Sequence, residues 1–366
     1  MTVTARDGNG AITVAEDASV HQLTKEHAMR IESTVTSMSW IPSEAVGGIM
    51  KLPFAIGFLH WDPPPPETVR PADLDELRAA DRFRFANELR AWIDVDDSGE
   101  ITGAGYAGRG HMGSTTLTLA GVSRRVPAIG FPDIQQPPEH GDGWVRFVQT
   151  TGGRPGMADP RKVNRPPYIQ ISGPIVWTTL ELTLHADGTV QRDLMGASPF
   201  PRHWVYADDG TLIRKSGVAD FRTWHGESFG SWTPWAGREQ QAIVADAESA
   251  LERELSALVM RGGTKPKLRK LKAGATLTEQ GQPGDELYLL LDGILTVEVD
   301  GQTVAEAGPG AILGQRAALE GGARTATLRA ATPVRVAVAT ADQLDRQALL
   351  ELSEGHRREE KLATTQ

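Results

Sequence analysis

The sequence predicts a mainly β protein that a linker helix divides into two domains. Asp-Gly pairs recur between short segments of alternating apolar and polar residues, as at 187–188, 209–210 and 300–301, and such pairs are the usual two-residue turns of β-hairpins. All nine tryptophans lie at or before Trp235, whereas Tyr288 is the one aromatic residue after it. This change in composition places a boundary near residue 237. We therefore expect a β-rich domain at 1–237, a helix and a basic segment at 238–265, and a second domain at 266–366.

The first domain is expected to be a β-barrel or sandwich with one or two short helices. Roughly nine strands are predicted before residue 220, and closure into a barrel would remove their exposed edges and leave room for one small ligand. A helix is predicted from Leu74 to about Phe85, because Asp73 and Glu76 have the spacing of a capping box. Residues 17–32 also favour a helix. The clearest strand segments are 89–95, 115–119, 126–131, 144–150 and 175–185.

Residues 238–260 carry apolar side chains at helical spacing and are predicted to form the helix that joins the domains. The segment that follows, Arg261–Lys272, carries six basic residues and no acidic ones. Nucleic acid or an anionic membrane could attract such a segment, but we favour a solvated linker that enters the first strand of the second domain.

Composition excludes several classes of site. The chain has no cysteine, which removes disulfides, thiolate metal sites and cysteine nucleophiles. A net charge of −9 argues against a broad nucleic-acid-binding face, and no apolar run approaches the ~20 residues that span a bilayer. We expect a cytoplasmic protein without a membrane span. Phosphate-loop, serine-elbow and zinc-protease motifs do not occur, so no catalytic residue is assigned. The sequence favours a protein that is not an enzyme but leaves this question open.

The second domain is predicted to be a small jelly-roll barrel with a terminal helix. Short strands and turns alternate between Leu268 and Ala341, including the apolar run Leu287–Leu291. In their midst lies a loop that begins at Gly314, contains small residues, and reaches an arginine, Arg324, ten positions later. Small residues let backbone N–H groups approach a ligand, and an arginine supplies the charge, so this loop suits a phosphate.

This loop and barrel resemble the cyclic nucleotide-binding domain, the family of bacterial cAMP-receptor proteins and of the regulatory subunits of protein kinase. The likeness covers about residues 266–351, and Gly314, Ala317, Arg324 and Ala326 match the family cassette in spacing. Three positions depart from it. Gln315 replaces a glutamate that accepts the ribose hydroxyl, and Arg316 and Ala318 replace residues that are often apolar or larger.

The resemblance implies a binding site for cAMP or cGMP. Arg324 would pair with the cyclic phosphate, and backbone groups near Ala317 and Ala318 would complete the cradle. An amide can accept a hydrogen bond but lacks the charge that strengthens it, so Gln315 predicts weakened affinity. The alternative is a degenerate barrel that binds nothing. The candidate binding residues are Gly314, Gln315, Arg316, Ala317, Ala318, Arg324, Thr325 and Ala326.

A second candidate pocket lies in the first domain. Its polar and aromatic patches contain arginines and histidines that could hold a carboxylate or a phosphate in a barrel mouth. The alternative is that they are surface loops with solvated charges. No metal site is predicted, because the loop from Asp94 that imitates a calcium site has Gly105 where the bidentate glutamate belongs. The candidates are Arg109, His111, Arg165, Arg202 and His203.

These features favour a regulatory protein in which a cyclic nucleotide, with cAMP as the first candidate, signals to the first domain through the linker helix. Two alternatives remain open: an enzyme or a carrier of a small molecule or lipid in the first domain beside a degenerate second domain, and a scaffold in which neither domain binds a small molecule. A homo-oligomer or a protein partner is left open. No nucleic acid is expected, since the roughly 25 residues after the last predicted strand are too few for a helix-turn-helix domain.

Overall fold

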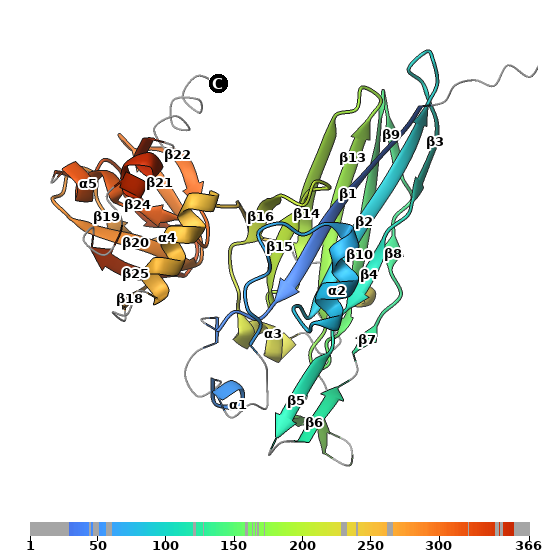
Figure 1. Ribbon diagram of the computed structural model, residues 1–366, viewed down its shortest axis with the longest axis horizontal. Helices are drawn as coiled ribbons and strands as arrows, with labels where there is room; N and C mark the ends of the chain where they lie inside the picture. Colours follow the sequence, from blue (N-terminus) through green and yellow to red (C-terminus); the bar gives the residue numbers. More distant parts are fainter. Residues whose placement is uncertain are drawn as a thin grey trace, which may run out of the picture.

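The computed structural model of the protein has an elongated β-sandwich beside a smaller β-barrel (Figure 1). The chain passes from one to the other through β17 (Val244–Asp246) and α4 (Ala250–Arg261). Among the described residues, no helix is long and apolar enough to cross a membrane. The structure describes residues 29–354, except for residues 44, 47–50, 56–60, 120–121, 127, 158–159, 163, 165, 167, 172, 228–232, 239–240, 262–265, 321, 341–343 and 345–346.

The N-terminal region is a sandwich of two antiparallel sheets and not a closed barrel. The first sheet has the order β17-β16-β15-β1-β2-β3, with β4 also paired to β2. The second has the order β14-β13-β10-β7, with β8 and β9 also paired to β10. The first sheet contains β1 (Met29–Trp40), β2 (Phe85–Val95), β3 (Ile101–Tyr106), β4 (Arg109–Met112), β15 (Arg202–Tyr206), β16 (Leu212–Ser216) and β17. The second contains β7 (Ile129–Gly130), β8 (Ile134–Gln135), β9 (Glu139–Gly141), β10 (Trp144–Arg154), β13 (Val176–His185) and β14 (Val190–Ala197).

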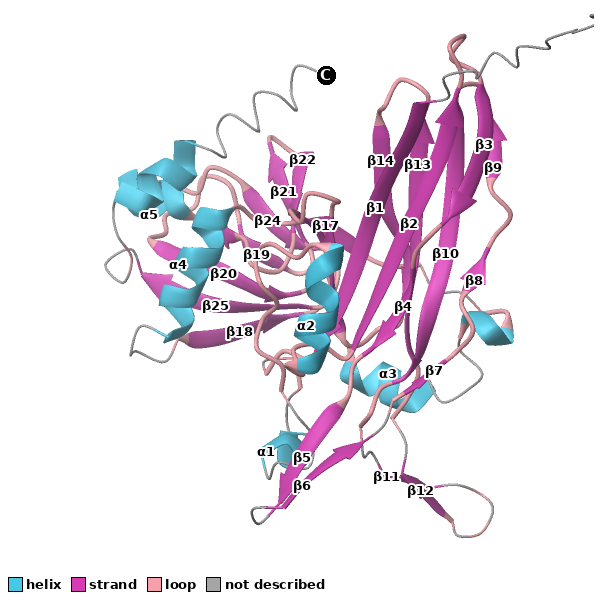
Figure 2. Cartoon of the chain, turned by 45° about the vertical axis from the view of Figure 1, so that its right-hand side comes forward, coloured by secondary structure: helices cyan, strands magenta, loops and turns pink. Residues whose placement is uncertain are grey.

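Alternating burial along the strands builds the sandwich core. Leu89 and Ile93 of β2 face Phe147 of β10 and Leu182 of β13, and all four are fully buried in one apolar cluster. Full burial of each such side chain contributes about 1.5–3 kcal/mol. Two further hairpins lie outside these sheets, β5 (Thr115–Leu119) with β6 (Val122–Val126), and β11 (Pro160–Lys162) with β12 (Ile169–Ile171). The β5–β6 hairpin extends beyond one end of the sandwich (Figure 2).

One helix prediction in this region is wrong, and another gives the right start but extends too far. Residues 29–32 belong to β1, where β-branched neighbours and pairing with β2 favour an extended chain; the rest of 17–32 lies outside the described residues. The helix at Leu74 ends at Ala79, because Asp81 has a φ of +58° that a helix cannot continue through. The described short helices are α1 (Leu52–Ala55), η2 (Pro71–Asp73), α2 (Leu74–Ala79), α3 (Phe221–Glu227) and η3 (Pro234–Ala236).

The predicted helix over 238–260 is also too long. Residues 244–246 form β17, which pairs with β16 as the edge of the first sheet, with Ala245 opposite Lys215. The helix α4 begins only at Ala250. Ser249 and Glu252 explain this start, since they form a capping box in which Glu252 Oε2 accepts from the Ser249 N–H at 3.0 Å. The first sheet therefore extends past residue 237.

The C-terminal region is the predicted barrel, with four strands in each of two facing sheets. Their orders are β18-β25-β20-β23 and β19-β24-β21-β22, and buried residues such as Leu290, Leu295 and Leu328 fill the space between them. On the outer face of the first sheet, Leu255 of α4 packs with Leu289 and with the helical residues 347–354. The elements are β18 (Lys267–Leu271), β19 (Thr276–Thr278), β20 (Glu286–Asp292), β21 (Leu295–Val299), β22 (Gln302–Ala307), β23 (Ile312–Leu313), α5 (Gln315–Glu320), β24 (Thr327–Ala330) and β25 (Val334–Thr340).

Candidate functional site

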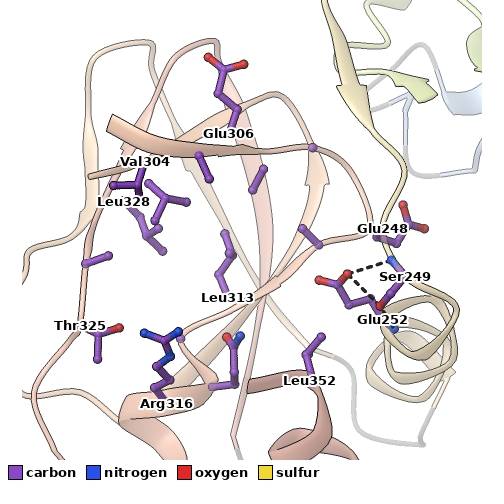
Figure 3. A pocket seen from close by; sticks show the side chains of 18 of the residues that line it. Glu248, Ser249, Glu252, Val304, Glu306, Leu313, Arg316, Thr325, Leu328 and Leu352 are labelled. Atoms are coloured by element: carbon purple, nitrogen blue, oxygen red, sulfur yellow. Dashed lines mark hydrogen bonds between the residues drawn. The ribbon is translucent and has the colours of Figure 1, made fainter. Parts of the chain in front are cut away.

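A cavity of about 650 Å³ opens in the barrel next to the start of α4 (Figure 3). This volume falls in the range of ligand pockets, about 300–1,000 Å³. Arg316 and Thr325 lie at one end of it, and Ser249 and Glu252 lie at the other (Figure 3). Apolar side chains such as Leu313 form the wall between these two polar ends.

The loop at Gly314 requires a glycine for two reasons. After β23 the chain turns sharply into α5, and Gly314 has a φ of +89°, which disfavours every residue with a side chain. A Cβ at this position would also lie 2.7 Å from Arg324 Nη1 and 2.9 Å from the Glu286 carbonyl oxygen. The glycine thus lets the loop backbone approach the arginine closely.

Arg324 is a buried cation without a carboxylate partner among the described residues. Its exposed fraction is 6%, and its Nη1 donates to the Glu286 carbonyl oxygen at 2.8 Å. Its guanidinium carbon lies 5.2 Å from the centre of the Tyr288 ring, and Nη2 lies 3.4 Å from the Tyr288 hydroxyl. Burial of a charge is costly unless an opposite charge compensates it. The cavity end at Arg324 is therefore suited to an anion.

Seven of the eight predicted cassette residues line this cavity. Gln315 is 4% exposed and follows Gly314 directly, and Arg316 is half-buried. Ala318 packs instead toward the apolar cluster beneath α4. The residues of the predicted set that line the cavity are Gly314, Gln315, Arg316, Ala317, Arg324, Thr325 and Ala326.

The other end of the cavity was not predicted from the sequence. Glu248, Ser249 and Glu252 lie between β17 and the first turn of α4, and Leu352 comes from the C-terminal helical residues. Glu252 is 5% exposed, and its Oε1 accepts from the Ile312 N–H at 3.1 Å, so it ties α4 to the strand that precedes the cassette. The Ser-x-x-Glu spacing at 249–252 is a capping-box signal that could have marked this segment.

The candidate residues of the first domain do not gather around one pocket. His111 on β4 lies 2.9 Å from Glu88 Oε2, and Arg109 on the same strand is exposed. Arg202 and His203 belong to β15, and β1 and β2 separate that strand from β4 within the sheet. Three strand spacings amount to about 14 Å. Arg165 lies outside the described residues.

Arg202 and His203 have structural partners. Arg202 Nη2 donates to Asp292 Oδ1 at 2.8 Å and to the Leu291 carbonyl oxygen at 3.0 Å, across the junction with the barrel. His203 is fully buried, with Nδ1 2.7 Å from Ser39 Oγ and Nε2 2.8 Å from the Ser198 carbonyl oxygen. Burial lowers the pKa of His203 to about 4. The ring is therefore neutral at pH 7, with Nε2 as the donor.

Comparison with known proteins identifies the family to which the barrel is similar. Residues 268–349 match the family model of the cyclic nucleotide-binding domain. This part of the chain is a cyclic nucleotide-binding domain. The match does not extend into the sandwich.

The cyclic nucleotide-binding domain has relatives in proteins of several kinds. A cyclic nucleotide-gated potassium channel of Mesorhizobium japonicum is 39% identical over 66 residues, which are 18% of this chain and 18% of the channel. The chain thus spans less than a fifth of the length of that curated relative. A cyclic nucleotide-binding domain of Methylobacillus flagellatus is 25% identical, with 30% of this chain and 70% of that chain covered and a TM-score of 0.21. The N-terminal domain of a transcriptional regulator of Streptomyces coelicolor is 26% identical, with coverage of 32% and 80% and a TM-score of 0.20.

Proposed function

We propose that the protein is a regulator whose cyclic nucleotide-binding domain binds cAMP or cGMP, with cAMP as the first candidate, and transmits binding to the sandwich. One observation carries the proposal: Arg324 is a buried cation without a carboxylate partner among the described residues, and it lines a cavity of about 650 Å³. A cyclic phosphate has the charge and the acceptor oxygens to compensate such a guanidinium.

The cassette residues would contact different parts of the nucleotide. Arg324 would pair with the cyclic phosphate, and Gly314 leaves room for the close approach of loop and ligand. Gln315 is buried in the wall and offers an amide oxygen to a ribose hydroxyl. Because this oxygen is uncharged, we expect an affinity lower than a glutamate would give. Arg316 also lies in the wall, near the phosphate end.

The contact between the two regions supports transmission. The segment between β17 and α4 lines the cavity, and β17 is part of the first sheet of the sandwich. Ser249 and Glu252 of the cavity wall follow Asp246, at the sandwich edge, by only three and six residues in the sequence. A displacement of the wall there can therefore reach the sandwich over a short stretch of chain. The similarity to the cyclic nucleotide-gated potassium channel of Mesorhizobium japonicum supports the same ligand class.

Titration calorimetry with cAMP and with cGMP tests the ligand. The Arg324→Ala variant should bind roughly 10- to 100-fold more weakly, because a hydrogen bond to a charged group contributes about 1.5–3 kcal/mol. The control is Arg329→Ala, since Arg329 is a surface arginine of the same barrel that pairs with Glu298. Wild-type protein that gives no heat with either nucleotide would overturn the proposal.

A second variant tests the ribose contact. Gln315→Glu should tighten binding by roughly fivefold, since a charged acceptor makes a hydrogen bond that is about 1 kcal/mol stronger. Unchanged or weaker binding would mean that residue 315 does not face the ribose.

A further inference from the structure

The described contacts between the sandwich and the cyclic nucleotide-binding domain include two groups that differ in their relation to the cavity. The first is at the end of β20, where Asp292 Oδ1 accepts from Arg202 Nη2 at 2.8 Å and from the Ala219 N–H at 3.0 Å. The Gly293 N–H also donates to the Gly217 carbonyl oxygen at 2.7 Å. Neither Asp292 nor Gly293 lines the cavity. This group anchors the two regions without touching the binding site.

The second group does reach the cavity. Lys215 of β16 forms an ion pair with Glu248, and both side chains are almost completely buried, with exposed fractions of 4% each. Lys215 Nζ also lies 4.2 Å from the centre of the Trp204 ring. Glu248 lines the cavity, so this pair connects a strand of the sandwich to the wall of the binding site.

The loop before the cassette rests directly on this segment. A Cβ at Gly310 would lie 2.3 Å from the carboxyl carbon of Glu248, and a Cβ at Gly308 would lie 2.2 Å from the Ala245 Cβ. Glycines at these two positions allow the loop to pack flush against β17 and Glu248. Two residues after Gly310, the Ile312 N–H is held by Glu252. Gly314 follows two residues later, so the backbone that leads into the cassette is supported at successive points.

Burial of the Lys215–Glu248 pair opposes separation of its two charges. Burial lowers the pKa of Lys215 to about 8 despite the adjacent carboxylate. Separation of the two charges would leave each of them buried and uncompensated, which is strongly unfavourable. A displacement of Glu248 by the loop must therefore carry Lys215 and β16 with it, or be resisted by them.

We propose that the Lys215–Glu248 pair positions the loop 308–314 of the binding site and thereby couples occupancy of the cavity to β16 of the sandwich. The coupling half of this inference rests on the proposed function, whereas the positioning half applies to the ligand-free protein. Lys215 and Glu248 are positioning residues, because they act through the loop and not through contact with the nucleotide.

Hydrogen exchange on the full chain tests the positioning first. The double variant Lys215→Met/Glu248→Leu replaces the pair by apolar side chains of similar size and leaves no charge unpaired. Without ligand, amides of residues 310–316 should exchange about tenfold faster than in wild type. Arg214→Met is the matched control, since Arg214 is the neighbour of Lys215 on β16 and pairs with exposed Asp246. It should leave these amides unchanged. Wild-type exchange in the double variant would overturn the positioning role.

The second arm adds cAMP and cGMP at saturation. In wild type and in Arg214→Met, ligand should slow exchange both in residues 312–318 and in β16. In the double variant, protection of 312–318 should remain and protection of β16 should be lost, and equal protection of β16 would overturn the coupling. If wild type binds neither nucleotide, the proposed function fails and coupling to these ligands fails with it, while the ligand-free arm still decides the positioning. Should the double variant not fold, Glu248→Gln keeps an acceptor for Lys215 and should show a smaller change of the same sign.

Discussion

The sandwich and the barrel both bury polar side chains, but they compensate them in different ways. In the sandwich, several buried groups bond to one another across the sheets: Ser37 Oγ lies 2.7 Å from Thr178 Oγ1, and Gln149 Nε2 donates to Asn87 Oδ1 at 2.9 Å. In the barrel, Arg324 has only uncharged partners among the described residues and borders a cavity. Compensated polar groups indicate architecture, and an uncompensated charge at a cavity indicates a site.

The largest change in stability is expected when a compensated charge is removed from the sandwich. Arg84 is 1% exposed and binds buried Asp62, with Nε 3.0 Å from Asp62 Oδ2, and its Nη1 donates to Thr115 Oγ1 at 2.5 Å. Arg84→Met leaves Asp62 without its cation, so the free energy of unfolding should fall by about 3–5 kcal/mol. Urea unfolding followed by tryptophan fluorescence measures this, because all nine tryptophans lie at or before Trp235.

The control for Arg84 is a surface pair in the barrel. Arg329 Nε lies 3.0 Å from Glu298 Oε1, and the Arg329 side chain is 44% exposed. Arg329→Met should cost less than about 1 kcal/mol, measured by circular dichroism, because water screens and solvates an exposed pair. Equal losses for the two variants would contradict the role assigned to burial.

The next effect in size concerns pH and the sandwich alone. The pKa of buried His203 is lowered to about 4 from an ordinary value of 6.5. Between pH 4 and pH 6.5, His203 is protonated in the unfolded chain but stays neutral in the folded protein. The free energy of unfolding is therefore at its full value above pH 6.5 and falls as the pH drops toward 4. The loss should reach about 3 kcal/mol. His203→Gln removes the titration and should flatten this part of the pH profile in tryptophan-monitored urea unfolding. Parallel profiles for variant and wild type would show that another group is responsible.

A smaller effect on stability than that of Arg84 or His203 is expected for one glycine from each region. Gly188 in a sandwich turn and Gly314 in the cassette have φ angles of +87° and +89°, so the backbone strain of alanine alone should cost about 1–2 kcal/mol at either position. At Gly188 a Cβ meets nothing within 4 Å, whereas at Gly314 it meets Arg324. Only Gly314→Ala should therefore lose cAMP affinity in calorimetry. Loss of affinity in Gly188→Ala would show that the cavity is sensitive to general destabilisation.

The cassette was predictable because its residues lie close together in sequence. Gly314 and Arg324 are ten positions apart, and the local turn into α5 sets most of their geometry. The wall formed by Glu248 and Glu252 depends on how α4 packs on the barrel, which periodicity does not reveal. The pattern over 238–260 predicts one helix, because β17 is only three residues long and its pairing with β16 is a long-range contact.

In the sandwich, strands could be predicted from the sequence, but the contacts between them could not. Its Asp-Gly turns and alternating strands predicted β structure, but sheet order decides which side chains meet. Arg202 and His111 were grouped as one pocket by their residue types, yet β1 and β2 lie between their strands. Arg202 instead reaches Asp292 of the barrel, a partner 90 positions away that only the fold brings near.

The three residues of β17 also determine where the chain can be cut. Although they follow residue 237, they complete the first sheet by covering the edge of β16. A fragment that ended at 237 would present the backbone N–H and C=O groups of β16 to solvent, and an open edge of this kind recruits strands from other molecules. We therefore expect a fragment cut at 237 to associate with itself more readily than one that keeps β17.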